Sequence, residues 1–212
     1  MTAKTSKNFA EATKILEDTG LLLLQGSDIP DVCHLVAKRR INQSWWGDPL
    51  GPQIFAVSEM LSDHPDVTIA KLVSGKVTFV HRTLWQKLIA VGNARDDWQT
   101  IKLSAQGRLL LGQVDKDGTL RTDKLGPKFG KKPGDVAREL ELRLLIHSEQ
   151  FHTESGHHTK LLETWETWRL RMGLRKKSLE SGRARNFFEK RVEELNKNFW
   201  RFGFLPWQAK KR

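Results

Sequence analysis

A lysine and a histidine in apolar surroundings are the first residues of this sequence that could carry out covalent chemistry. Lys71 and His81 lie at opposite ends of a β-hairpin that the β-branched residues of Val67 to Val80 predict. Burial lowers the pKa of a lysine, so that its neutral amine becomes a nucleophile or a base, as in lyase chemistry. A lysine on the solvated face of a strand is the alternative interpretation. Both residues are therefore catalytic candidates, and the sequence leaves open whether the protein is an enzyme.

Histidines crowd the segment 147–158, where the question is metal binding. His147 and His152 are five residues apart and share neither a helix face nor a strand face. Across a hairpin that turns at Ser155-Gly156, His152 and His158 could face one another as metal ligands. No cysteine and no spaced carboxylate motif accompanies them, so a polar hairpin tip is the preferred interpretation, and we expect neither a metal nor a cofactor.

The loop from Gly126 to Gly134 is rich in glycine, proline and lysine. It contains Gly130-Lys131, but only three residues separate Gly126 from Gly130, and Lys132 follows instead of the Ser or Thr of a phosphate-binding P-loop. Lys128, Lys131 and Lys132 are instead candidates for contacts with phosphate groups, with a plain solvated connection as the alternative. The sequence also lacks the serine-hydrolase elbow and the dinucleotide fingerprint.

The positive charge is concentrated at the carboxyl end. The chain has 212 residues and a net charge of +11, yet residues 1–168 hold 22 Lys and Arg against 21 Asp and Glu. Residues 169–212 hold 14 basic residues against 4 acidic ones. Such an asymmetry indicates a partner of dense negative charge, because many phosphate contacts add up through counterion release. Nucleic acid is the first candidate and an anionic membrane surface the second.

Within this tail the spacing predicts an amphipathic helix. Its apolar residues step by four, three and four, and we expect them to dock on the body of the protein or on a partner chain, which leaves a homodimer or a partner protein open. Those residues are Phe188, Val192, Leu195 and Phe199. The candidate nucleic-acid contacts of the tail are Arg183, Arg185, Lys190, Lys197 and Arg201. Glu193 lies four residues before Lys197 and partly neutralises that face.

Trp45 and Trp46 lie in a loop rich in Gly and Pro, residues 42–52. An exposed aromatic pair can stack on a base or line a pocket, whereas tryptophans more often cover a core. The single cysteine, Cys33, excludes an internal disulfide and favours a reducing compartment. Because no apolar segment exceeds four residues, we predict a cytoplasmic protein that neither is secreted nor spans a membrane.

The first hundred residues combine helices with a β-hairpin. A helix is expected over Asn8 to Asp18, closed by Gly20, followed by a buried strand at Leu21 to Leu24. A second helix is predicted to begin at Ser27 to Pro30. Two β-branched segments joined by Ser74-Gly75 predict the hairpin, and further helices are expected over residues 53–61 and 84–91.

A different pattern begins at Ser104. A helix from Ser104 ends at Asp117-Gly118, Thr122 caps a short turn of helix, and a third helix begins near Asp135. The alternation of residues 145–163 predicts a second hairpin. In this order of elements, Ser104 to Trp168 resembles a winged-helix domain, a helix-turn-helix variant whose third helix enters the major groove while the hairpin touches the backbone or the minor groove. The long loop Gly126 to Gly134 departs from the compact pattern.

The charges of the third helix do not favour base reading. Arg138 and Arg143 are candidates for nucleic-acid contacts, but together with the three acidic residues of the helix they give a net charge of −1. The acidic residues are Asp135, Glu139 and Glu141. Many winged-helix folds are protein-interaction modules. The whole chain also loosely resembles a bacterial protein family to which no activity is attached.

These observations predict an α+β protein with three parts: a mixed α/β part over residues 1–100, a winged-helix-like part over 101–168 and a basic helical extension over 169–212. The predicted function is nucleic-acid binding, with DNA favoured. One alternative is an enzyme acting on nucleic acid, of the repair glycosylase or nuclease type, with its pocket near Trp45, Trp46, Lys71 and His81. The other is a protein-interaction module without nucleic-acid contact.

Overall fold

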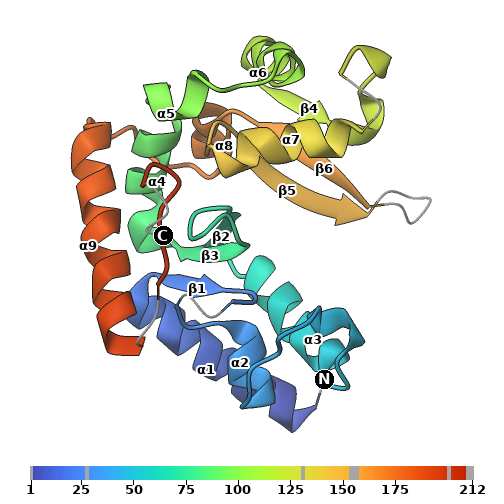
Figure 1. Ribbon diagram of the computed structural model, residues 1–212, viewed down its shortest axis with the longest axis vertical. Helices are drawn as coiled ribbons and strands as arrows, with labels where there is room; N and C mark the ends of the chain where they lie inside the picture. Colours follow the sequence, from blue (N-terminus) through green and yellow to red (C-terminus); the bar gives the residue numbers. More distant parts are fainter. Residues whose placement is uncertain (1, 27–28, 130–131, 153–157, 200–201, 209–212) are drawn as a thin grey trace. The chain divides into compact units, whose positions relative to one another are not determined.

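The computed structural model describes residues 2–26, 29–129, 132–152, 158–199 and 202–208, with the backbone alone for 151, 152 and 158 (Figure 1). These residues form α-helices and two three-stranded antiparallel sheets, which confirms the predicted α+β class. The chain forms two compact units: the first unit comprises Met1–Trp85 and Asn186–Arg212, and the second Gln86–Arg185. This division differs from the predicted boundaries at residues 100 and 168.

The first unit begins as the apolar pattern indicates. Helix α1 spans Ala3–Thr19, with the Thr2 side chain accepting from the Thr5 N–H at its start and Gly20 at its end. Gly20 has a φ of 78°, a left-handed conformation that glycine adopts without steric cost. Strand β1, Leu21–Leu23, follows at once and is fully buried. The predicted helix and buried strand are therefore confirmed, with the helix starting five residues earlier.

The predicted first hairpin is confirmed. Strands β2, Val67–Ala70, and β3, Thr78–His81, pair in antiparallel orientation, and β1 pairs with the other edge of β3. At the turn, Ser74 and Gly75 have φ values of 53° and 67°, and the Lys76 N–H donates to the Val73 carbonyl over 2.9 Å. Two left-handed residues in succession are typical of a type I′ turn.

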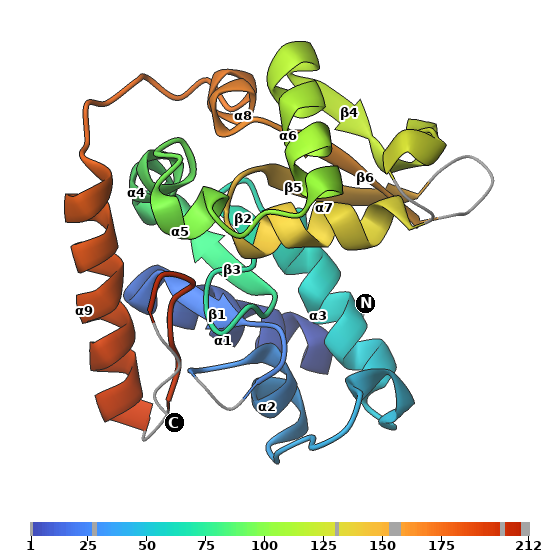
Figure 2. The same ribbon diagram turned by 45° about the horizontal axis from the view of Figure 1, so that its top comes forward.

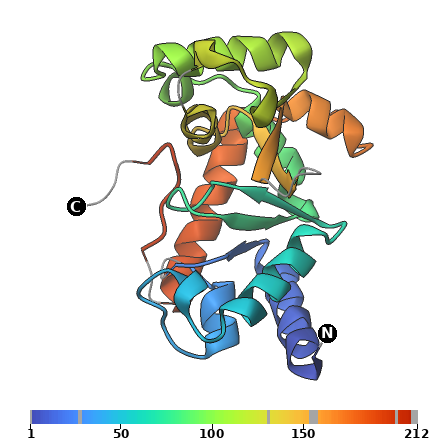
Figure 3. The same cartoon turned by 90° about the vertical axis from the view of Figure 1, so that its right-hand side faces the viewer.

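Three helices cover one side of this sheet, as Figures 1 and 3 show. They are α1, α2 (Val32–Ala37) and α3 (Gly51–Ser62), the last preceded by the 3₁₀ turn η1 at Trp45–Gly47. The helix start predicted at Ser27 to Pro30 is wrong. The Leu23 N–H donates to the Pro30 carbonyl and Asp31 forms a parallel bridge with Leu23, so both residues lie beside β1. Helix α2 begins only after Asp31, whose side chain caps it by accepting from the His34 N–H.

Helix α9, Ser181–Phe199, runs from the second unit into the first. Phe188, Val192 and Leu195 are buried, whereas Phe199 is 44% exposed. The segment after α9 folds back along it, and Trp207 packs 6.4 Å from the Phe188 ring centroid (Figure 1). The predicted apolar stripe thus exists at three of its four positions, and residues of the same chain cover it.

The segment after α9 is tied to the body by hydrogen bonds. Gly203 exchanges two of them with the Asn196 side chain, at 2.7 and 2.8 Å. The Ser74 N–H donates to the Phe204 carbonyl over 2.7 Å, which connects this segment to the β2–β3 turn. The segment 202–208 is therefore tied into the first unit.

The first unit's opening segment ends with the 3₁₀ turn η2 (Arg82–Leu84) and Trp85, the first residue of helix α4 (Trp85–Gly92). The rest of α4 and helix α5 (Asp97–Thr100) begin the second unit. Helix α6, Ala105–Asp117, starts at Ser104, whose side chain accepts from the Gly107 N–H, and ends at Gly118, as predicted. Strand β4 (Thr119–Arg121) and the 3₁₀ turns η3 (Thr122–Lys124) and η4 (Pro127–Phe129) follow. Strand β4 is short, with one exposed and two half-buried residues, so it gives no alternating signal and was not predicted.

The remaining elements are α7 (Pro133–Leu142), β5 (His147–His152), β6 (His158–Glu163) and α8 (Trp165–Arg171). Strand β6 pairs with β5 on one side and with β4 on the other, so the predicted second hairpin is joined by a third strand. Helices α6 and α7 pack against each other over this sheet (Figure 2). Their shared core contains Leu110, Val114, Leu140 and Leu162. Among the described residues, no helix has both the length and the apolar character needed to cross a bilayer.

Gly92 and Trp165 lie in close contact within the second unit. A Cβ at position 92 would lie 2.2 Å from two atoms of the Trp165 indole. That indole is buried and donates from Nε1 to the Leu144 carbonyl over 2.7 Å. No side chain larger than hydrogen fits at position 92 without displacing the tryptophan.

We therefore expect Gly92→Ala to lower the free energy of unfolding by about 1 to 3 kcal/mol, since overpacking forces the rigid indole out of place. Gly112→Ala is the matched control, because Gly112 lies exposed within α6 with no atom within 4 Å of its added Cβ. It should stabilise the protein by about 0.5 to 1 kcal/mol through helix propensity. Urea denaturation of both variants measures the difference, and equal effects would contradict the packing argument.

Candidate nucleic-acid interface

The connection between α6 and α7 presents lysines to solvent. Lys124, Lys128 and Lys132 are exposed, while Phe129 between them is buried in the core of the second unit. The Lys128 amine lies 4.8 Å from the Phe129 ring centroid and 3.4 Å from Gln113 Oε1. The buried phenylalanine thus fixes the loop while its lysines point outward. Lys124 was not predicted, and Lys131 lies outside the described residues.

Helix α7 adds one exposed arginine. Arg138 is exposed, and no ion pair is formed by it among the described residues. Arg143 has a different role, because its guanidinium donates to the carbonyls of Trp98, Gln99 and Lys102. These bonds hold the α5–α6 segment, so Arg143 is a structural residue here. We call the four outward cations Lys124, Lys128, Lys132 and Arg138 the basic face.

The net charge of α7 does not describe its exposed side. Glu139 accepts from the N–H and the hydroxyl of Ser104, at 2.8 and 2.6 Å. Glu141 is buried and accepts from the Ser148 hydroxyl and the Lys160 amine. Both glutamates are therefore turned toward donors of their own unit, and Asp135 and Arg138 remain exposed on the helix. The negative net charge of α7 is therefore weaker evidence against phosphate contact than the sequence alone indicates.

Acidic neighbours neutralise much of the carboxyl-terminal charge. Arg183 pairs with Glu180 over 3.2 Å, Arg185 with Asp96 over 3.6 Å, and Lys197 with Glu193 over 2.8 Å. The Glu193 hydrogen bond raises the pKa of Lys197. Lys190 is exposed, and Arg201 lies outside the described residues. Surface pairs of this kind contribute little to stability, but they reduce the positive potential that a polyanion meets.

Three further cations lie between α8 and α9 and were not singled out in the sequence. They are Arg175, Lys176 and Lys177, all exposed. Lys176 and Lys177 line a pocket of about 310 Å³ in the second unit, together with Arg169 and Glu166. Arg169 is itself engaged, because its guanidinium donates to both Glu166 oxygens at 2.8 and 2.9 Å and to the Leu174 carbonyl. Only a run of three adjacent basic residues in the sequence could have drawn attention to this segment.

The histidine segment contains a buried ionic network. His147 is 4% exposed, and its Nδ1 lies 3.0 Å from Glu163 Oε1. The imidazole stacks on Trp168 at 4.8 Å, and Arg171 donates to the same glutamate over 2.6 Å. Burial disfavours the charged Glu163, but the hydrogen bonds from His147 and Arg171 outweigh it and lower the pKa. This histidine is a core residue.

The structure describes the two candidate metal ligands in their backbone alone. His152 and His158 are register partners across β5 and β6, whereas their side chains lie outside the described part of the chain. Among the described residues, no group of three histidine, cysteine, aspartate or glutamate side chains could hold a metal ion.

The tryptophan pair is half core and half surface. Trp45 is 7% exposed and Trp46 66%, and their rings stack at 4.1 Å. Phe55, 38% exposed, lies 5.5 Å from Trp46. Trp45 thus covers the core, as its residue type favours, while Trp46 presents an indole face to solvent that a planar ring could stack on.

Lys71 and His81 lie apart, as their spacing predicts. His81 pairs with Val67 at the far end of the hairpin, and its Nδ1 lies 3.0 Å from the Thr83 hydroxyl. Lys71 follows β2 next to the turn and is half-buried. Neither residue, nor the tryptophan pair, lines the pocket of about 430 Å³ in this unit, so the proposed catalytic grouping gains no support from its geometry.

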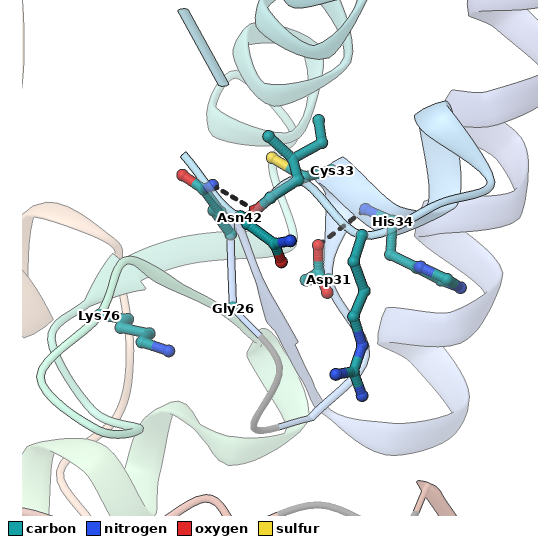
Figure 4. Close-up of a pocket in the computed structure, with 9 residues that line it drawn as sticks. Gly26, Asp31, Cys33, His34, Asn42 and Lys76 are labelled. Atoms are coloured by element: carbon teal, nitrogen blue, oxygen red, sulfur yellow. Dashed lines mark hydrogen bonds between the residues drawn. The ribbon is translucent and has the colours of Figure 1, made fainter. Parts of the chain in front are cut away.

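That pocket was missed by the sequence analysis. It has a volume of about 430 Å³, and its charged or polar side chains include Asp31, His34, Arg40, Asn42 and Lys76 (Figure 4). Asp31 comes from the segment between β1 and α2, His34 from α2 itself, Arg40 and Asn42 from the segment after α2, and Lys76 from the β2–β3 turn. Their separation in sequence gives no motif, and only the fold brings them together.

Comparison of the chain with protein-family models, with curated proteins and with solved structures found no match.

The buried network makes a pH prediction. The pKa of Glu163 is lower in the folded than in the unfolded chain, so the unfolded chain binds more protons in acid. The stability that ionised Glu163 contributes is therefore present above a pH of about 4.5 and is lost as the pH falls below it. Glu163→Gln should lower the free energy of unfolding by about 1 to 3 kcal/mol at pH 7, with the difference from wild type shrinking toward pH 3. Glu149→Gln, at an exposed partner of Arg171, is the control. A pH-independent difference would contradict the linkage.

Proposed function

We propose that the second unit is a winged-helix-like module that binds duplex nucleic acid, with DNA favoured over RNA, through the basic face. The order of its elements supports this: helix α6, a short 3₁₀ segment at Thr122–Lys124, helix α7 and the β5–β6 hairpin follow one another. This is the order implied by the winged-helix resemblance, with α7 as the helix that meets the major groove. The deep, narrow major groove of duplex RNA does not admit a helix, which favours DNA.

Exposed cations at the start of α7 are the observation that carries the proposal. The second unit holds 20 Lys and Arg against 13 Asp and Glu, a net charge of +7. Lys124, Lys128 and Lys132 precede α7 or stand at its first turn, and Arg138 lies one turn further on. Phosphate contacts from such side chains fix a protein on a duplex without reading its sequence. The arrangement supports binding and positioning, with little that would select a base sequence.

The tail helix takes a smaller part in this proposal than its composition indicated. Arg183, Arg185 and Lys197 have acidic partners, and the apolar stripe of the helix is buried in the first unit. The exposed segment Arg175 to Lys177, which belongs to the second unit, can add phosphate contacts.

Removal of the tail cannot test the proposal, because residues 186–212 complete the first unit. We instead expect the triple variant Lys128→Ala, Lys132→Ala and Arg138→Ala to bind a 20-base-pair DNA about tenfold or more weakly at low salt. The slope of log affinity against log salt should fall by about 2 to 3, since each lost phosphate contact removes about 0.9. Fluorescence anisotropy across ionic strengths measures both quantities.

The charge-matched control is Arg183→Ala, Lys190→Ala and Lys197→Ala in α9. It removes the same three charges, yet we expect a smaller change in slope because two of those side chains are ion-paired. Equal losses from both triple variants would show that only net charge matters and would contradict the basic face. Salt-independent or absent binding of the wild type would favour a protein-interaction module instead. A duplex RNA of the same length tests the preference for DNA.

A further inference from the structure

The pocket of the first unit combines cations with a buried carboxylate. Arg40 and Lys76 line it, together with Asp31, which is only 7% exposed, and Asn42. Ile41 and the buried Cys33 supply apolar surface. A volume of about 430 Å³ falls within the range of roughly 300 to 1,000 Å³ that small-molecule pockets occupy.

Gly26 allows Lys76 to reach the pocket. A Cβ at position 26 would lie 3.0 Å from the Lys76 amine and 2.9 Å from Leu23 Cδ1. In Figure 4 the lysine extends from the side opposite Asp31 and His34. The close approach of the amine to the backbone at Gly26 therefore depends on the missing side chain, and it places a positive charge across the pocket from the carboxylate.

The pocket is built for binding and lacks an activated nucleophile. Burial, with Asp31 and Asp48 nearby, raises the pKa of Cys33 to about 12, so its thiol stays protonated. Asp31 does not orient the His34 ring, because the hydrogen bond of 2.7 Å runs from the His34 backbone N–H. Figure 4 shows the imidazole turned away from the carboxylate. Cys33 is therefore not an activated nucleophile, and Asp31 and His34 do not form a catalytic dyad.

We propose that this pocket binds a nucleoside monophosphate. Arg40 and Lys76 supply the charge that a phosphate requires, while Asp31 would repel a bare phosphate. The carboxylate favours a ligand that also brings N–H or O–H donors, and the Asn42 amide offers both a donor and an acceptor. Ile41 and Cys33 provide apolar contact for a ring. A phosphate joined to a sugar and a base meets all of these requirements in one molecule.

Calorimetric titration of the full chain with AMP, ribose 5-phosphate and inorganic phosphate tests this proposal. We expect AMP to bind saturably, at least about tenfold more tightly than inorganic phosphate, since it gains charge-assisted hydrogen bonds with Asp31. Lys76→Ala and Arg40→Ala should each weaken AMP by about tenfold. Ribose 5-phosphate should fall between the two, and equality with AMP would contradict recognition of the base.

Two variants separate the site from a general effect of charge. Asp31→Asn keeps a residue that can cap α2 but removes the negative charge, so it should weaken AMP while leaving or improving phosphate binding. Gly26→Ala keeps all charges and should weaken AMP by displacing the Lys76 amine. Lys71→Ala, on the same hairpin but outside the pocket, is the control and should leave AMP binding unchanged.

The proposal is overturned if AMP fails to saturate, if phosphate binds as tightly as AMP, or if Lys71→Ala weakens AMP as much as Lys76→Ala does. Circular dichroism of each variant checks that it is folded. The outcome is independent of the DNA measurements, because the triple variant of the basic face lies in the second unit and should bind AMP normally.

Discussion

The junction between α7 and the β5–β6 hairpin depends on one buried indole. Helix α7 ends at Leu142, and two residues later the buried Leu144 has a φ of 52°, a left-handed conformation that costs a residue with a side chain about 1 kcal/mol or more. The Leu145 N–H returns to the Leu140 carbonyl, closing the helix, and Trp165 Nε1 donates to the Leu144 carbonyl. Trp165 can reach that carbonyl only because Gly92 leaves room for it. The direction in which α7 points is thus set by residues far from it in sequence.

The net charge of a segment and the charge that it leaves without an acidic neighbour differ in this protein, and the proposed site for a polyanion rests on that difference. The tail has the largest excess of basic residues, but several of those in its helix form ion pairs with acidic neighbours. The apolar face of the helix is buried in the first unit. Helix α7 has a negative net charge, yet two of its glutamates serve as internal acceptors. A count of charges along the sequence cannot separate these cases, because it does not include the partners that folding supplies.

Local signals predicted the elements whose causes are local. The Ser104 cap, the left-handed ends at Gly20 and Gly118, and the Ser74-Gly75 turn were all predictable, since each depends on residues within one turn of chain. The wrong helix start near Pro30 has a distant cause, the pairing of its carbonyl with Leu23. The return of residues 186–212 to the first unit and the pocket around Asp31 likewise depend on contacts between segments that no short motif encodes.

The two candidate sites both suit phosphate, but they present it with different surroundings. The cations of the basic face are exposed, so dissolved ions compete for them and screen them over about 8 Å at physiological salt. In the pocket, Lys76 is half-buried and faces a carboxylate that is itself nearly buried, so its field is screened less and its selectivity is greater. An exposed set of cations suits a long polymer that contributes many similar contacts. A pocket lined by two cations and a nearly buried carboxylate suits a single small molecule that has both anionic and donor groups.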